Sequence, residues 1–124
     1  MKEIEIIENE LNEDMLELIK YHLPNNNRDT IKVYENFKHQ TILYYKDEVL
    51  DAMLSYFFFD FPYDIIVVMQ RDNKFYKHMW RVLRDTINSR VKPLRIMSDP
   101  NNRVLVKGAI RHGGVWIDDE IHFK

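Results

Sequence analysis

Cysteine is absent from this chain, and glycine is scarce, with three among 124 residues. The absence of cysteine excludes a disulfide framework, a thiolate zinc site and a cysteine nucleophile. The three glycines are Gly108, Gly113 and Gly114, so residues 1–107 contain none. Phosphate-binding loops use glycine to bring backbone N–H groups close to the phosphate, and this distribution therefore excludes a P-loop and a Rossmann fingerprint.

Long hydrophobic runs and metal-ligand patterns are missing as well. The apolar runs at residues 56–59 and 65–69 are far shorter than the roughly 20 residues of a membrane-spanning helix, and the first residues lack the apolar stretch of a signal peptide. The histidines form no pair at i, i+4 spacing, so no metal site is predicted. With 45% hydrophobic residues and no cysteine, the composition predicts one soluble, cytoplasmic domain over residues 1–124.

Charge is distributed unevenly, although the formal net charge is only −2. Residues 1–20 are rich in acids, namely Glu3, Glu5, Glu8, Glu10, Glu13, Asp14 and Glu17. Residues 71–95 are rich in bases, namely Arg71, Lys74, Lys77, Arg81, Arg84, Arg90, Lys92 and Arg95. The stripe from Lys74 to Arg84 follows helical spacing, and we expect it either to pair with the acidic N-terminal helix or to bind an anionic partner.

Hydrophobic periodicity predicts elements in the order β, α, α, β, β, β, α, β, α, β. The expected strands are residues 3–8, 41–45, 49–59, 65–69, 94–97 and 115–123, and the expected helices are residues 11–22, 28–37, 75–89 and 100–112. Residues 49–59 also fit helical spacing, but their aromatic run and the turn expected at Lys46-Asp47 favour a strand. The run from Ile65 to Met69 is rich in β-branched residues, which predicts a central strand buried on both faces.

The last helix has clear boundaries in the sequence. Asp99 is its expected N-cap, and Pro100 is suited to the first helical position. Gly113 and Gly114 end the helix, and we expect one of them to adopt positive φ.

This order of elements, together with two local features, resembles the GCN5-related N-acetyltransferase (GNAT) fold, and in particular the small divergent GNAT-like proteins of tailed bacteriophages. The first feature is the hairpin expected at Asp47-Glu48-Val49. The second is the stretch from Asn101 to Val115, which is similar to the family's asparagine, helix and glycine before the last strand. The resemblance extends over residues 39–123. It implies an α/β (α+β) fold with a mixed, mostly antiparallel sheet of about six strands and about four flanking helices.

The resemblance implies acetyl-CoA as the cofactor, bound at the loop that follows the fourth strand. Family members have glutamine or arginine there, then two residues, glycine, one residue, and glycine or alanine. In this chain Asn73 and Phe75 stand where the small residues are expected. The helix N-terminus still attracts an anion, and the cofactor-binding candidates are Gln70, Arg71, Asn73, Lys74, Phe75 and Asn101.

The residues for proton transfer also depart from the family pattern. Family members often have a tyrosine in the last helix, four residues before the glycine of the final strand, and that position is Ile110 here. Asp60 or Asp64 is the candidate general base. His112 could replace the tyrosine, or it could simply stabilise the helix end.

Three functions stay open from the sequence. The first is a GNAT-like, phage-encoded domain with a degraded or atypical acyl-CoA site, which acts in the virion or on the host through contacts with a protein partner or a second copy. The aromatic run from Tyr56 to Tyr63 and the acidic N-terminal segment are its expected contact regions. The second is an active acetyl-CoA-dependent N-acyltransferase. The third is a module that binds nucleic acid or another anionic partner through the basic helix at residues 74–84.

Overall fold

The computed structural model describes residues 1–58, 62–72, 74–98 and 103–124. The strands are β1 (Lys2–Glu8), β2 (His39–Lys46), β3 (Val49–Phe57), β4 (Asp64–Gln70), β5 (Leu94–Met97), β6 (Val115–Ile117) and β7 (Glu120–Phe123). The helices are α1 (Glu13–His22), α2 (Arg28–Asn36), α3 (Tyr76–Ser89) and α4 (Arg103–Arg111). None of these described helices is long and apolar enough to cross a membrane. The predicted cap of α4 at Asp99 and Pro100 lies outside the described residues.

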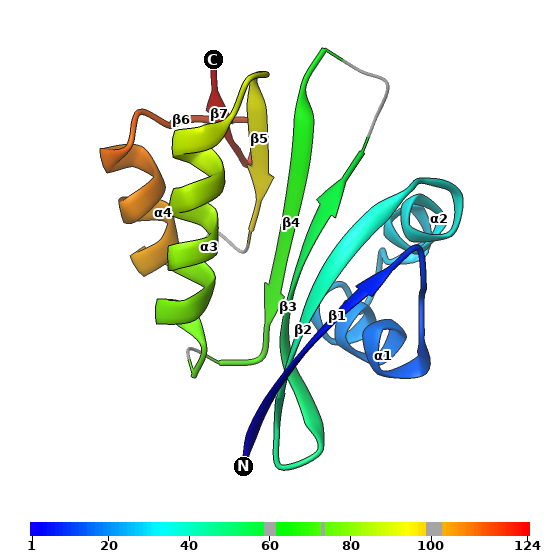
Figure 1. Ribbon diagram of the computed structural model, residues 1–124. Helices are drawn as coiled ribbons and strands as arrows, with labels where there is room; N and C mark the ends of the chain where they lie inside the picture. Colours follow the sequence, from blue (N-terminus) through cyan, green and yellow to red (C-terminus); the bar gives the residue numbers. More distant parts are fainter. Residues whose placement is uncertain (59–61, 73, 99–102) are drawn as a thin grey trace.

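The strands form one seven-stranded sheet in the order β1-β2-β3-β4-β5-β7-β6 (Figure 1). Neighbouring strands are antiparallel except β4 and β5, which run parallel. β4 is the fourth of the seven strands, so the prediction of a central strand is confirmed. Ile66, Val68 and Met69 of β4 are buried because helices cover both of its faces. The predicted mixed, mostly antiparallel sheet is therefore confirmed, with one strand more than expected.

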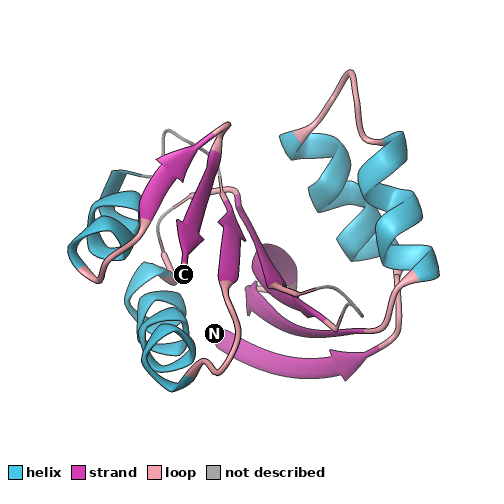
Figure 2. Cartoon of the chain, turned by 90° about the horizontal axis from the view of Figure 1, so that it is seen from above, coloured by secondary structure: helices cyan, strands magenta, loops and turns pink. Residues whose placement is uncertain are grey.

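Helices α1 and α2 cover one face of the sheet, and α3 and α4 cover the other (Figure 2). Each helix pair buries its own cluster of apolar side chains. Neighbouring residues of β4 divide between the two clusters: Val68 belongs to the α3/α4 core and Met69 to the α1/α2 core, as the alternation of side chains along a strand requires.

The segment predicted as one strand over residues 115–123 is a hairpin, so that part of the prediction was wrong. The chain turns at Asp118 and Asp119, whose φ values are 48° and 64°, and returns as β7. Positive φ at both central residues is the geometry of a type I′ turn, which aspartate tolerates better than most residues. No glycine or proline marks this turn, and the sequence therefore resembles one uninterrupted strand.

The hairpin between β2 and β3 is confirmed, with its turn one residue later than expected. Asp47 and Glu48 have φ values of 51° and 69°, again the two positive angles of a type I′ turn. β1 pairs with β2 at the edge of the sheet. The face that carries Ile4 and Ile6, expected to be the buried one, is exposed, whereas Ile7 packs against the α1/α2 core.

The glycine pair ends α4 as predicted. Gly113 has a φ of 96°. The N–H of Gly114 donates to the carbonyl of Ala109 at 3.0 Å, and the N–H of Gly113 donates to the carbonyl of Ile110 at 3.1 Å. These two bonds form a Schellman motif, which satisfies carbonyl groups at the end of the helix and turns the chain toward β6.

Candidate ligand-binding cleft

β4 and β5 are paired over only part of the length of β4. Their parallel register joins Asp64 to Leu94 and extends to Val67 and Met97. The last residues of β4, from Val68 to Gln70, pair with β3 but not with β5. The two central strands therefore part at their carboxyl ends, which in sheets with parallel strands is a common place for ligands.

A cavity of about 500 Å³ lies beside this opening. Three parts of the chain supply its walls: the α1–α2 region, the sheet at β3 and β4, and the ends of β5 and of the β6–β7 turn. The lining residues are His22, Leu23, Thr30, Val33, Tyr34, Phe57, Val67, Val68, Met69, Met97, Ser98 and Asp119. The volume and the mostly apolar walls are typical of a small-molecule site.

Three polar side chains stand out in this lining. His22 is the last residue of α1, and its Nε2 contacts the backbone of Gln70, accepting from the Gln70 N–H at 2.8 Å. The hydroxyl of Ser98, just after β5, is buried and has no hydrogen-bond partner among the described residues. Asp119 supplies the carboxylate of the lining. The cavity thus offers a few polar groups to orient a ligand that is otherwise apolar.

A buried chain of hydrogen bonds fixes the wall formed by α2. The Tyr34 hydroxyl bonds the Ser55 hydroxyl at 2.6 Å, which bonds the Thr41 hydroxyl at 2.9 Å. Thr41 in turn bonds Nδ1 of His39 at 3.1 Å. Burial raises the pKa of Tyr34 well above its usual range and lowers the pKa of His39. Both side chains therefore stay neutral at pH 7, and the network anchors α2 on the sheet without a buried charge.

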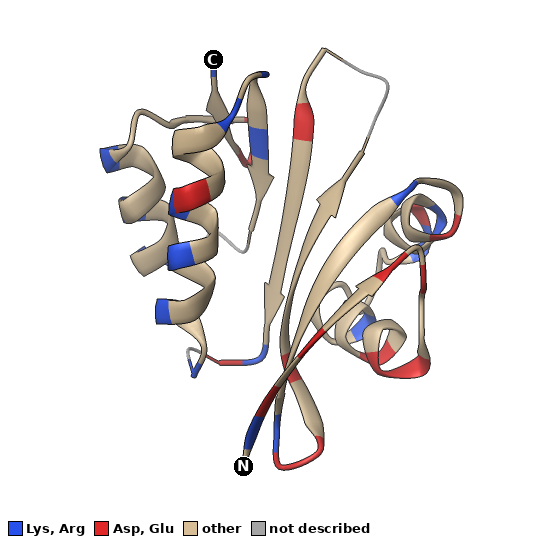
Figure 3. Ribbon diagram, viewed as in Figure 1, with Lys and Arg blue, Asp and Glu red and all other residues tan. Residues whose placement is uncertain are grey.

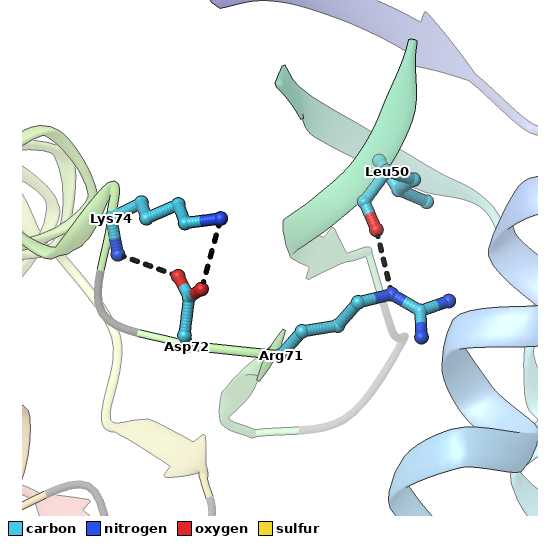
Figure 4. Close-up of polar contacts among 4 residues, drawn as sticks. All are labelled: Leu50, Arg71, Asp72 and Lys74. Carbon is cyan, nitrogen blue, oxygen red and sulfur yellow. Dashed lines mark hydrogen bonds and ion pairs between the residues drawn. The ribbon is translucent and has the colours of Figure 1, made fainter. Parts of the chain in front are cut away.

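The loop between β4 and α3 is the place where the resemblance implied the CoA diphosphate. Here the charged side chains already make contacts within the chain (Figure 4). Asp72 accepts from the backbone N–H of Lys74 at 3.0 Å, and its carboxylate lies 3.1 Å from Lys74 Nζ. The Nε of Arg71 donates to the carbonyl of Leu50 at 3.1 Å, and its guanidinium lies over the ring of Tyr21.

A second carboxyl group, that of Asp51, lies beside Asp72. Asp51 on β3 is only 4% exposed. Burial, and then the charge and hydrogen bond of Asp72, raise its pKa, while the bonds from Lys74 hold the pKa of Asp72 below its usual range against the effect of burial. Asp72 and Asp51 therefore form an interacting pair of carboxyl groups, and the carboxylate of Asp72 opposes the approach of a diphosphate.

The structure distributes the predicted cofactor-binding residues over different surroundings. Gln70 is mostly buried at the end of β4, and Arg71 and Lys74 make the contacts just given. Phe75 is buried in the α3/α4 core, with its ring 5.2 Å from that of Tyr44. Asn73 and Asn101 lie outside the described residues.

Of the predicted catalytic residues that the structure describes, Asp64 and His112, neither lines the cavity. Asp64 begins β4, where it accepts from the Tyr56 hydroxyl at 2.5 Å and lies 3.8 Å from Lys92. His112 lies just past the end of α4, where its Nδ1 is 3.0 Å from the carbonyl of Gly108. Asp60 lies outside the described residues.

Sequence reasoning missed His22, Ser98 and Asp119 as members of one site. His22 was expected only as the last residue of the helix over residues 11–22, and Ser98 and Asp119 belong to no spacing pattern. Only the fold brings these three positions together.

Solved structures with the same arrangement of elements include several acetyltransferases. An acyl-CoA N-acyltransferase from Pseudomonas aeruginosa aligns with a TM-score of 0.65 at 13% identity, covering 98% of this chain and 97% of its own. A Bacillus subtilis acetyltransferase in complex with CoA aligns with a TM-score of 0.59 at 10% identity, over 98% and 95% of the two chains. The N-acetyltransferase PseH of Campylobacter jejuni, in complex with acetyl coenzyme A, aligns with a TM-score of 0.54 at 13% identity, over 96% and 95%.

The chain has a GNAT-like fold. The similarity lies in structure alone, since no protein-family model and no curated protein matches the sequence. At 10–13% identity the likeness to these GNAT-fold enzymes extends to the architecture and not to their activities.

Proposed function

We propose that this GNAT-fold chain binds acyl thioesters in the cleft between β4 and β5, with an atypical site for the CoA diphosphate. The proposal rests on one observation above all: the two strands part after Val67 and Met97, beside a cavity of about 500 Å³. A cavity of this size with mostly apolar walls suits an acyl group and the pantetheine arm that carries it. The CoA complexes of the Bacillus subtilis and Campylobacter jejuni proteins support the choice of ligand.

The loop between β4 and α3 contributes little to the binding of the CoA diphosphate. Lys74 is already paired with Asp72, and Arg71 is directed toward Leu50 and Tyr21. An incoming anion has to separate the first pair and approach a carboxylate. The apolar arm therefore supplies most of the affinity, and the diphosphate adds little to it.

Calorimetry with two ligands tests whether the apolar arm, and not the diphosphate, supplies most of the affinity. Acetyl-CoA and S-acetylpantetheine share the acyl group and the pantetheine arm, and only the first carries the diphosphate. We expect dissociation constants within about threefold of each other, a difference below about 0.7 kcal/mol. Asp72→Asn should strengthen the binding of acetyl-CoA and leave that of S-acetylpantetheine unchanged. Asp85→Asn, on the exposed side of α3, is the matched control and should change neither.

Two results would contradict the proposal in different ways. Failure of both ligands to bind would mean that the cleft is not a thioester site. Binding of acetyl-CoA more than about thirtyfold tighter than S-acetylpantetheine would mean that the diphosphate site is an effective one, as expected for the alternative of an ordinary acetyl-CoA-dependent N-acyltransferase.

A second candidate function, self-association, is favoured by the edge strand β6. Its three residues, Val115, Trp116 and Ile117, are all exposed and carry no charge. An unpaired edge strand of this kind can pair with a strand of another chain. Pairing of β6 with the β6 of a second copy would meet no charge repulsion. Pairing of β1 with a second β1 would bring glutamates together. Light scattering should find a dimer that Trp116→Lys converts to a monomer. A monomeric parent protein would exclude this mode.

A further inference from the structure

The outer surfaces of α3 and α4 carry a concentration of positive charge that the proposed cleft does not use. We define the basic face as Lys77, Arg81 and Arg84 of α3 with Lys107 and Arg111 of α4, all of which are exposed. Figure 3 shows lysine and arginine along both helices. Asp85, which lies 3.5 Å from Arg84, is the only acid within either helix.

The two rows of cations adjoin because the helices pack closely. The Trp80 ring covers Gly108, where an added Cβ would lie 2.9 Å from the indole. Lys77 and Arg84 are three residues before and four residues after Trp80, and Arg111 is three residues after Gly108. Such spacings place side chains on the same side of a helix, so the cations border the α3–α4 contact from both helices.

The acids of residues 1–20 do not neutralise this face. They belong to β1, α1 and the segment between them, and α1 packs on the opposite face of the sheet. Among the described residues no ion pair joins α1 to α3, so the expected pairing of the acidic helix with the basic one does not occur. Helix layers on the two faces are roughly 20 Å apart at about 10 Å per packed layer, which exceeds the Debye length of about 8 Å at physiological ionic strength. An anion therefore meets the basic face and not the net charge of −2.

We propose that the basic face binds the phosphate backbone of double-stranded nucleic acid. Backbone binding requires cations and no apolar anchor. On α3 and α4 the exposed large apolar residues are Val104 and Ile110, and none is aromatic. A protein partner would use buried aromatic anchors, and a single strand would use aromatic side chains on which bases stack. The face has neither and is therefore best suited to a duplex.

The number of cations determines how steeply the affinity for a duplex depends on salt concentration. Lys77 and Arg84 are separated by about 10.5 Å along the helix axis, and a duplex carries one phosphate charge per about 1.7 Å of its length. Five cations that each meet a phosphate give a slope of about −4.5 in a plot of log affinity against log salt. The affinity should therefore fall about 100-fold between 50 and 150 mM salt.

Fluorescence anisotropy with the full chain and a labelled 20-base-pair DNA of arbitrary sequence tests the proposal. We expect micromolar binding at 50 mM salt with the steep slope just given. The triple variant Lys77→Gln, Arg81→Gln, Lys107→Gln should lower the slope by about 3 and weaken binding more than tenfold. A control triple variant, Lys20→Gln, Arg28→Gln, Lys32→Gln, removes the same charge from exposed positions of α1 and α2 and should bind as the parent does.

Thermal unfolding of both triple variants checks that each is folded, and we expect no change because all six side chains are exposed. Absence of binding at 50 mM salt would overturn the proposal, as would equal losses in the two variants. Tighter binding of single-stranded DNA or of polyglutamate would overturn it as well, the latter in favour of an acidic protein. None of these outcomes depends on the cleft, because the cleft residues are unchanged.

Discussion

At the scale of single residues, Asp51 is a carboxyl group in an unfavourable electrostatic position. It is buried on β3 beside the carboxylate of Asp72, and burial is the main cause of its raised pKa. Because the folded state holds this proton more tightly than the unfolded state, folding loses stability as the pH rises from the unfolded pKa through the folded pKa. At pH 7, above the unfolded pKa, Asp51 therefore lowers the stability of the fold.

Asp51→Asn should therefore raise the melting temperature at pH 7. The amide is neutral at every pH and can donate a hydrogen bond to Asp72. The gain should shrink toward pH 3, where Asp51 is protonated in both states. Scanning calorimetry at several pH values measures this, with Asp85→Asn as an exposed control. A gain independent of pH would show that the buried charge is not its cause.

The two glycines after α4 should respond differently to alanine. Gly113 has positive φ and open space around an added Cβ, so Gly113→Ala incurs strain alone, about 1 kcal/mol. At Gly114 the Cβ would lie 2.5 Å from Ile121 and 2.9 Å from the carbonyl oxygen of Ala109, which cannot move without breaking the Schellman motif. Gly114→Ala should therefore cost more, roughly 2–3 kcal/mol. Urea denaturation compares the two, and equal costs would contradict this account.

At the scale of elements, the β2–β3 hairpin is held by a turn whose second residue is poorly suited to it. Glu48 has a φ of 69°, a conformation that glycine adopts without strain. Glu48→Gly should stabilise the protein by about 0.5–1 kcal/mol, measured by thermal or chemical unfolding. Lys46→Gly, at the last position of β2, is the control and should destabilise instead. Stabilisation by both would point to a cause other than turn geometry.

The helices and most strands were predictable because their signals are local. Asn12, of a residue type favoured at helix N-caps, caps α1: its side chain accepts from the N–H of Met15 at 2.9 Å. The β6–β7 turn was not predicted, because Asp118 and Asp119 adopt positive φ and no glycine marks the turn in the sequence. The cavity was not predicted for a different reason. His22, Ser98 and Asp119 are far apart in the sequence, and they line one cavity only because β4 and β5 part in the folded chain.

At the scale of the whole molecule, the order of elements and two local features were enough to predict the GNAT-like fold, although the solved structures that share it are only 10–13% identical to this chain. It was not enough to predict which charges would meet. Residues 1–20 and 71–95 suggested an attraction between the acidic and basic segments, but the sheet separates α1 from α3. A sequence gives the number of charges, and only the topology of the sheet assigns them to faces.

The two cores also differ in when they can form. The buried members of the α1/α2 core all come from residues 15–69, whereas the α3/α4 core needs residues as late as Phe123. A ribosome extends a chain by about 5–20 residues per second, so the first core can close several seconds before β7 has been made. Until residues 94–97 have been made, β4 is the last strand of a half-built sheet and has no β5 to pair with. The strand that finally lies at the centre is thus, in a nascent chain, the edge most open to pairing with a neighbour.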